Sequence, residues 1–240
     1  MPVVPFFVVL LALVMLARLA QREKAAQRGR RGRLLADCLP LFDTAAVTPG
    51  GDGFPRLEGT IGRRRIRIEF VPDSMTIRRL PQLWMVLTIL DPQPIPTAIG
   101  ALIRPSDTEF YALTPTLPHR LEAAAPFPPG TSLRASTPEA ASVLLQVAEP
   151  MARLLADEKV KEVAVTPKGL RAVYQAAEGR RGQHLLLRQC DFGDAMVSPA
   201  ALVRLHDGLD AVAASLRPVQ DPPSRADKAA GAVLPRPDKS

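Results

Sequence analysis

The stretch from Val3 to Ala17 constrains this chain more than any other feature, because it holds no charged or polar side chain. As a helix over residues 2–20, at about 1.5 Å per residue, it would be about 28 Å long, close to the hydrocarbon thickness of a bilayer. A secretory signal peptide would begin with basic residues and end at a small-residue cleavage site. The best cleavage site in this chain lies after Ala20. Arg18 then occupies a position just before the cleavage site that requires a small side chain. We therefore predict a retained transmembrane helix over residues 2–20.

Basic residues flank this segment on one side only. Seven Lys and Arg residues lie within residues 18–33, and only the terminal amine precedes the apolar run. Lys and Arg near a membrane span favour the cytoplasmic side. The sequence thus predicts a single-pass protein of a bacterial plasma (inner) membrane, with the N-terminus outside and the rest of the chain in the cytoplasm.

Changes in composition divide the rest of the chain into three parts. Residues 21–33 are polar and basic, which is typical of a juxtamembrane connector. Residues 34–216 are enough for one domain with its own core. Residues 217–240 are polar and rich in proline, which predicts a disordered tail.

The net charge is +7, yet part of this basicity has a simple explanation. Arg greatly outnumbers Lys and there is no Asn, as expected for a genome rich in G and C. The charge alone therefore does not indicate a ligand.

Strand patterns occur throughout the domain. Residues 64–71 alternate, with Ile66, Ile68 and Phe70 on one side and charged residues on the other, as in a half-buried strand. Residues 82–90 are mostly apolar and do not alternate, as in a central strand that is covered on both faces. The expected strands are 57–61, 64–71, 82–90, 101–104, 131–135, 162–166, 170–177 and 184–192.

Helical spacing of apolar residues predicts three helices in the domain, over 34–42, 137–155 and 199–216. Thr137 and Ser198, each followed by proline, are expected to begin the second and third. The fold class is therefore α+β: an N-terminal transmembrane helix followed by one domain of antiparallel β-sheet with about three helices. A duplicated helix–meander unit would account for the similar order of elements in the two halves.

Patterns typical of catalysis or metal binding do not occur. No nucleophile elbow, phosphate loop or dinucleotide fingerprint is present, and Cys38 and Cys190 do not form a Cys-x-x-Cys pair. Two buried thiols are expected. The acidic residues Asp107 and Glu109 are expected to be solvated in a loop. We predict no catalytic residue, cofactor or metal ligand, and the sequence argues against an enzyme without excluding one.

Arginines provide the strongest functional signal. A basic face of this kind could contact anionic lipid headgroups or a membrane-protein partner. Sheets that bind nucleic acid usually add exposed aromatic side chains, which are scarce here, so nucleic acid is disfavoured. The candidate contact residues are Arg28, Arg30, Arg31, Arg33, Arg63, Arg65 and Arg67.

These observations favour a binding or scaffolding module at the inner face of a bacterial plasma membrane. Two alternatives stay open. One is an enzyme with its site near the Pro-rich segment 92–136, because long irregular segments often carry functional sites. The other is an envelope-side domain with one disulfide between Cys38 and Cys190.

Overall fold

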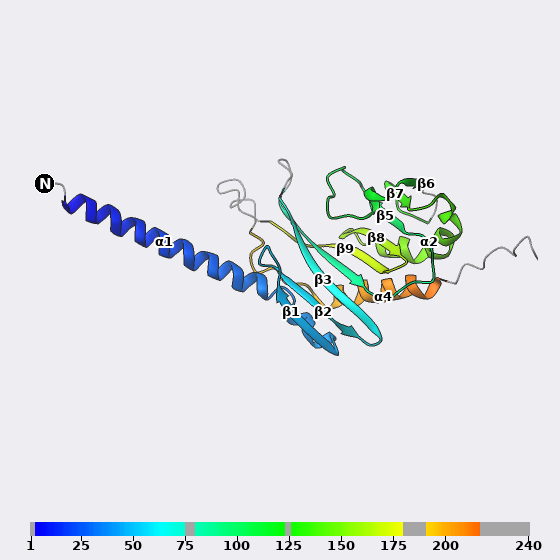
Figure 1. Cartoon of the computed structure of the whole chain (residues 1–240), viewed down its shortest axis with the longest axis horizontal. Coiled ribbons are helices and arrows are strands. Elements are labelled where there is room, and N and C mark those ends of the chain that lie inside the picture. Colours follow the sequence, from blue (N-terminus) through cyan, green and yellow to red (C-terminus); the bar gives the residue numbers. More distant parts are fainter. Residues whose placement is uncertain (1–2, 75–79, 123–125, 180–190, 217–240) are drawn as a thin grey trace, which may run out of the picture.

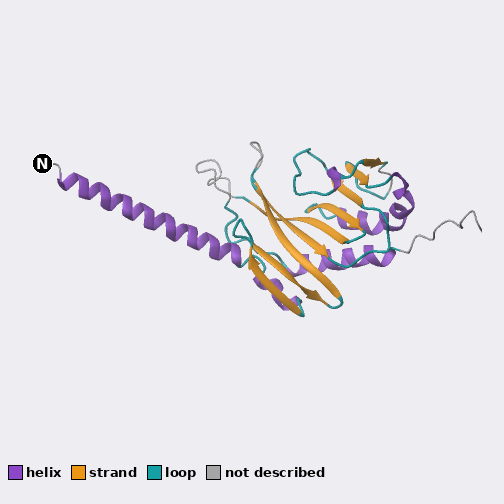
Figure 2. Ribbon diagram, viewed as in Figure 1, coloured by secondary structure: helices purple, strands orange, loops and turns teal. Residues whose placement is uncertain are grey.

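The computed structural model describes residues 3–74, 80–122, 126–179 and 191–216. A long N-terminal helix, α1 (Val3–Gly32), projects from a domain in which helices lie against a single β-sheet (Figure 1, Figure 2). The sheet and its helices form the α+β architecture that the sequence predicts.

The described residues form one nine-stranded sheet in which every neighbouring pair is antiparallel. Its spatial order is β1-β2-β3-β4-β9-β8-β5-β7-β6. The strands are β1 (Thr44–Pro49), β2 (Pro55–Ile61), β3 (Arg64–Asp73), β4 (Gln82–Ile89), β5 (Ile99–Ile103), β6 (His119–Leu121), β7 (Thr131–Ala135), β8 (Val160–Thr166) and β9 (Gly169–Glu178).

One face of the sheet carries the main apolar core. The alternation in β3 points Ile66, Ile68 and Phe70 to this face, where α2 (Ala141–Leu155) and α4 (Pro199–Ser215) also contribute buried residues. Central strand β4 is buried on both faces, because Trp84 and Val86 belong to a second, smaller cluster on the opposite side. The predicted half-buried strand and the predicted central strand are both confirmed.

Two strands do not coincide with any predicted strand. All six residues of β1 are exposed, so this strand has no buried apolar residue that would produce an alternating pattern. β6 is only three residues long. Most of the strand predicted at 184–192 and the tail at 217–240 lie outside the described residues.

The predicted helices differ from the structure mainly at their starts. The first is the short 3₁₀ helix η1 (Ala36–Leu41), which contains Pro40. The second begins as the 3₁₀ turn η3 (Pro138–Ala140) and becomes α-helical only at Ala141. Thr137 does not cap it, because its hydroxyl instead donates to Thr97 Oγ1 over 3.0 Å.

Helix α1 continues through the predicted connector and ends at Gly32. Over the part of the chain that the structure describes, none of the helices is both long enough and apolar enough to cross a membrane. The transmembrane span at 2–20 therefore stays a prediction.

The predicted duplication is not evident in the described elements. The first half is a four-stranded meander, β1 to β4, whereas α2 is followed by the β8–β9 hairpin. A third strand of that second unit would fall within 184–192, outside most of the described residues.

Candidate functional site

The end of α1 is fastened to the domain by Arg31. Its Nη1 atom donates a hydrogen bond of 2.7 Å to the backbone carbonyl of Asp52, in the turn between β1 and β2. Its guanidinium carbon lies 4.5 Å from the centroid of the Phe54 ring, within the range of a cation–π interaction. Phe54 is itself buried, with its ring centroid 6.4 Å from that of Phe70. Arg31 therefore joins the base of α1 to the core.

A groove of about 870 Å³ opens beside this junction. Arg28 and Arg31 line it from α1, and Val47 and Pro49 line it from β1. Arg30 lines a small neighbouring cavity, and Arg33 is exposed. The structure thus gathers the four predicted arginines of residues 28–33 around one junction.

The predicted arginines of the sheet lie elsewhere. The turn that carries Arg63 is at the opposite end of the β2–β3 hairpin from the junction, and β2 is about 20 Å long at 3.3 Å per residue. Arg65 donates to the Leu90 carbonyl over 2.9 Å, and Arg67 lies 2.9 Å from Glu58. The two predicted groups of arginines therefore do not form one continuous patch.

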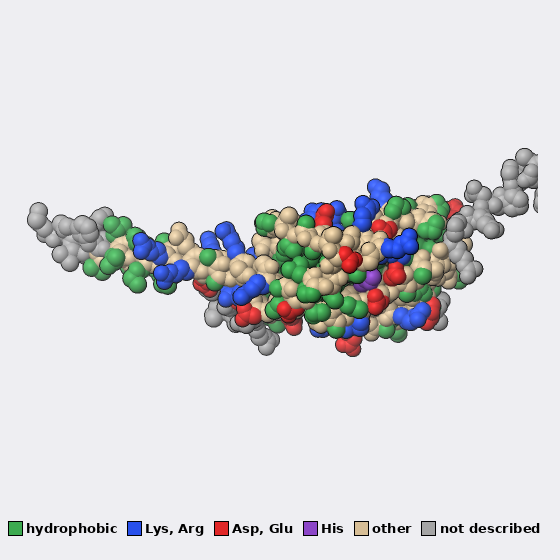
Figure 3. All heavy atoms as spheres, turned by 90° about the horizontal axis from the view of Figure 1, so that it is seen from below, with side chains coloured by type: hydrophobic (Ala, Val, Ile, Leu, Met, Phe, Trp, Pro, Cys, Tyr) green, Lys and Arg blue, Asp and Glu red, His purple; other side chains and the backbone are tan. Residues whose placement is uncertain are grey.

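Acidic side chains accompany the basic ones on the domain. Figure 3 shows Lys and Arg interspersed with Asp and Glu on the visible face of the domain, whereas basic side chains stand out along α1. The Arg56–Glu69 and Arg64–Asp210 pairs, at 3.2 and 2.6 Å, illustrate this compensation. The junction is consequently the more distinctive basic feature.

A second candidate region lies under the Pro-rich segment, on the sheet face opposite α2 and α4. Residues 104–117 cross this face between β5 and β6, and include the short helix η2 (Thr114–Thr116). Tyr111 stacks on Trp84 with ring centroids 4.9 Å apart, and Arg171 donates to the Tyr111 carbonyl. The segment is thus an ordered cover over the centre of the sheet.

A buried ion pair holds the start of this cover. Lys161 Nζ lies 2.9 Å from Glu109 Oε1, which also accepts hydrogen bonds from the amide and hydroxyl of Ser106 at 2.8 and 2.6 Å. Desolvation raises the pKa of Glu109, but the bonds from Ser106 and Lys161 outweigh it and lower the pKa from 4.5 to about 2. The expectation that Glu109 is solvated is wrong, because Lys161 reaches it from β8.

A second buried carboxylate holds the end of the cover. Glu162 is fully buried, and its Oε1 accepts bonds of 2.6 and 2.7 Å from the amide and hydroxyl of Thr114. Its Oε2 lies 3.7 Å from Arg171 Nε, and neither of these two atoms has a hydrogen-bond partner among the described residues. Burial raises the pKa of Glu162, although Arg171 and Thr114 favour the charged form. Neither Lys161 nor Glu162 was a predicted site residue.

The backbone of the cover is strained at two positions. Arg104 and Asp107 have φ values of 48° and 60°, in the left-handed region that is unfavourable for residues with a side chain. Lys161 Nζ donates to the Arg104 carbonyl over 2.6 Å. The buried ion pair therefore stabilises the strained conformation at the start of the cover.

Two cavities flank the cover, with volumes of about 190 and 480 Å³. Lys161, Trp84 and Asp73 line the smaller one, and Arg120, Arg134 and Ser132 line the larger one. Neither cavity has a histidine or cysteine among its described lining residues, and the described chain contains no cluster of His, Cys, Asp and Glu suited to a metal ion. The lining side chains are chemically suited to binding polar or charged groups.

Cys38 is a buried free thiol that donates to the Val197 carbonyl over 3.3 Å. Burial, followed by the charge of Asp37, raises its pKa to about 11, so the thiol is protonated and unreactive at neutral pH. The expectation of a buried thiol is confirmed for this cysteine. Cys190, its partner in the alternative disulfide, lies outside the described residues.

No protein-family model and no curated protein matches this chain.

Proposed function

We propose that the chain is a binding or scaffolding module held at the inner face of a bacterial plasma membrane by α1. One observation carries the proposal: the first half of α1 presents large apolar side chains to solvent. Leu11 and Leu16 are 64% and 63% exposed, and Val8, Leu13, Met15 and Leu19 are also more than half exposed. Figure 1 places this half of α1 away from the domain.

An apolar surface of this kind is unfavourable in water. Burying a Leu or Val side chain is worth about 1.5–3 kcal/mol, so several of them on one isolated helix favour an apolar environment. The sequence before Val8 contributes further apolar residues to the same helix. Insertion of this half into a bilayer would bury all of these side chains together.

The positions of the basic residues favour different partners for different parts of α1. Arg22 and Lys24 would lie about 3 and 6 Å beyond Ala20 along the helix axis, within the headgroup layer of a bilayer. Arg28 would lie about 12 Å beyond it, outside that layer when the helix stands upright. We therefore assign the headgroup contacts to Arg22 and Lys24, and an acidic segment of a membrane-protein partner to the groove at Arg28 and Arg31.

Protease protection of a C-terminally tagged chain in spheroplasts tests the anchor and its direction. We expect protection of the tag until the cells are lysed, and retention of the chain in membranes after alkaline carbonate washing. Release by carbonate would contradict a transmembrane span, and digestion in intact spheroplasts would invert the topology and favour the envelope-side alternative.

A second experiment tests the role of the junction arginines. Arg28, Arg30 and Arg33 are changed together to Gln, and Arg31 is kept because it binds the domain itself. We expect unchanged flotation with vesicles that contain phosphatidylglycerol, but weaker crosslinking of the chain to neighbouring membrane proteins. Loss of flotation would instead assign these arginines to lipid headgroups.

A further inference from the structure

Two arginines on neighbouring strands line the larger cavity beside the cover. Arg120 of β6 and Arg134 of β7 are direct antiparallel partners. Side chains at such positions have Cβ atoms about 4.5–5.5 Å apart, and like charges placed there are destabilising. Both arginines line the cavity of about 480 Å³, so the repulsion is located at a concave site.

The charges of these arginines are not neutralised within the described chain. Arg134 donates to the Leu117 carbonyl over 3.1 Å, and Arg104, which also lines the cavity, donates to the Glu158 carbonyl over 3.0 Å. Both acceptors are uncharged. The Arg120 side chain has no hydrogen-bond or ion-pair partner among the residues that the structure describes.

The acidic residues of the cavity do not compensate these three guanidinium groups. Glu109 is already paired with Lys161 at 2.9 Å, which leaves Asp107 as the one acidic lining residue of the described chain outside an ion pair. The lining residues therefore include three arginines and one uncommitted carboxylate, a formal excess of two positive charges. A ligand with two negative charges would neutralise it.

The neutral groups of the cavity also suit an oxyanion. Ser132 is two residues before Arg134 on β7, so the two side chains share a face of the sheet. The Ser132 hydroxyl has no partner among the described residues and lines the same cavity. One guanidinium group can donate two parallel hydrogen bonds to two phosphate oxygens, and a hydroxyl adds a further donor.

We propose that the cavity lined by Arg104, Arg120, Arg134 and Ser132 binds a phosphate monoester or a similar dianion. A phosphate monoester carries about −1.5 to −2 charges at neutral pH, which matches the formal excess of the lining residues. The anion site itself is independent of the membrane function proposed above, and only its assignment to a soluble ligand rests on that function.

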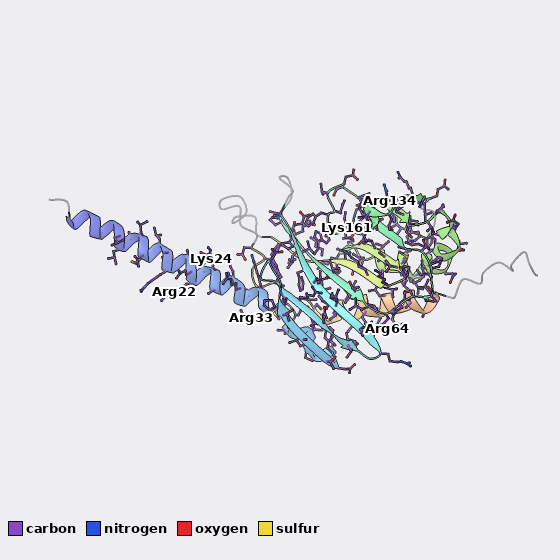
Figure 4. The ribbon with its side chains drawn as sticks, in the orientation of Figure 1. Arg22, Lys24, Arg33, Arg64, Arg134 and Lys161 are labelled. Atoms are coloured by element: carbon purple, nitrogen blue, oxygen red, sulfur yellow. The ribbon has the colours of Figure 1, made fainter. Side chains whose placement is uncertain are left out.

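The position of the cavity favours a soluble ligand. Figure 4 places Arg134 in the part of the domain away from α1, whereas Arg33 marks the junction with α1. If α1 lies in a bilayer, the cavity lies in the part of the domain away from the lipid surface. A phosphorylated small molecule in solution can reach it, and a lipid headgroup of the same membrane cannot.

Calorimetric titration of the full chain in detergent micelles with inorganic phosphate, at constant ionic strength, tests the proposal. We expect saturable binding, and a loss of affinity of about tenfold or more in Arg120→Gln and in Arg134→Gln. Arg153→Gln is the matched control, because Arg153 is an exposed arginine on α2 outside the cavity, and its affinity should equal that of the unchanged chain.

A stability measurement separates binding from a structural role. Without phosphate, Arg120→Gln should unfold at the same temperature as the unchanged chain or a higher one, because the like-charge pair is relieved. With phosphate, the unchanged chain and Arg153→Gln should gain more stability than Arg120→Gln. The proposal would be overturned if the unchanged chain did not bind phosphate. It would also be overturned if Arg120→Gln and Arg134→Gln bound phosphate as tightly as the unchanged chain does. Binding of phosphatidic acid vesicles that is lost in Arg120→Gln, without any binding of inorganic phosphate, would overturn the soluble ligand and assign the site to a lipid headgroup.

Discussion

Lys161 and Glu109 form an ion pair in which Nζ and Oε1 are 2.9 Å apart and the side chains are only 10% and 2% exposed. Lys161 extends from β8 and Glu109 from the cover, so the pair joins a central strand to a segment about 50 residues earlier in the chain. Because both charges are desolvated, each depends on the other.

Acid is therefore expected to weaken the fold through Glu109. Its pKa falls from 4.5 to about 2 on folding, so the unfolded chain takes up the proton first. The resulting stability is fully present above pH 4.5 and is lost as the pH falls toward about 2, with an upper magnitude of about 3 kcal/mol. Urea unfolding of the full chain between these pH values should show the loss, and Glu109→Gln should abolish this part of the pH dependence.

The same variant should be strongly destabilised at neutral pH. Glu109→Gln leaves the Lys161 ammonium buried without a counter-charge, which typically costs about 3–5 kcal/mol. The double variant Glu109→Gln/Lys161→Met removes both charges and should recover much of the loss. A double variant as unstable as Glu109→Gln alone would contradict the view that the unpaired ammonium causes the effect.

Glu162 is expected to titrate in the opposite direction from Glu109. Burial raises its pKa above 4.5, so its ionisation contributes a loss of stability as the pH rises above 4.5 and through the folded pKa. Carbon-13 NMR of the glutamate carboxyls should show one group that titrates above the ordinary range and one near pH 2, assigned with Glu162→Gln and Glu109→Gln. Titration of both below 4.5 would contradict the dominance of burial at Glu162.

Gly100 is required where β5 passes beneath the cover. A Cβ at this position would lie 2.3 Å from Thr114 Oγ1, and Thr114 is fully buried against Glu162. Gly100→Ala should therefore displace Thr114 and lower the free energy of unfolding by about 1–3 kcal/mol. Gly29→Ala is the matched control: nothing lies within 4 Å of a Cβ there, so this variant should raise the helicity of α1. Thermal unfolding and circular dichroism check both expectations.

The strands with a strong hydrophobic pattern could be predicted from the sequence, whereas the buried charges beneath the cover could not. Strand β3 alternates because one of its faces packs on the core, and β4 is continuously apolar because both of its faces are covered. In contrast, the side chains of β1 are all exposed, so burial leaves no pattern in its sequence. Lys161 and Glu162 look like ordinary surface charges in the sequence, and they are buried only because residues 104–117 fold over them. That contact joins distant segments and has no local signal, although two adjacent charges in an otherwise apolar strand were a hint.

The positions and roles of the arginines could also be predicted only in part from the sequence. Their clustering at residues 28–33 is visible in the sequence, and the structure brings these residues to one junction. The different role of Arg31 depends on Asp52 and Phe54, which follow it by about 20 residues. Likewise, the opposition of Arg120 and Arg134 depends on the register of β6 and β7, which the sequence does not specify.

Arg31 should matter for the junction of α1 with the domain in a way that Arg33 does not. Arg31→Gln removes the cation–π contact with Phe54 and the bond to the Asp52 carbonyl, which together are worth about 1–2 kcal/mol. Arg33 carries the same charge two residues later, is exposed, and has no side-chain hydrogen bond or ion pair among the described residues. Hydrogen exchange of the amides of residues 50–56 should therefore become faster in Arg31→Gln and stay unchanged in Arg33→Gln. Equal acceleration in both variants would mean that net charge, rather than these contacts, fastens α1 to the domain.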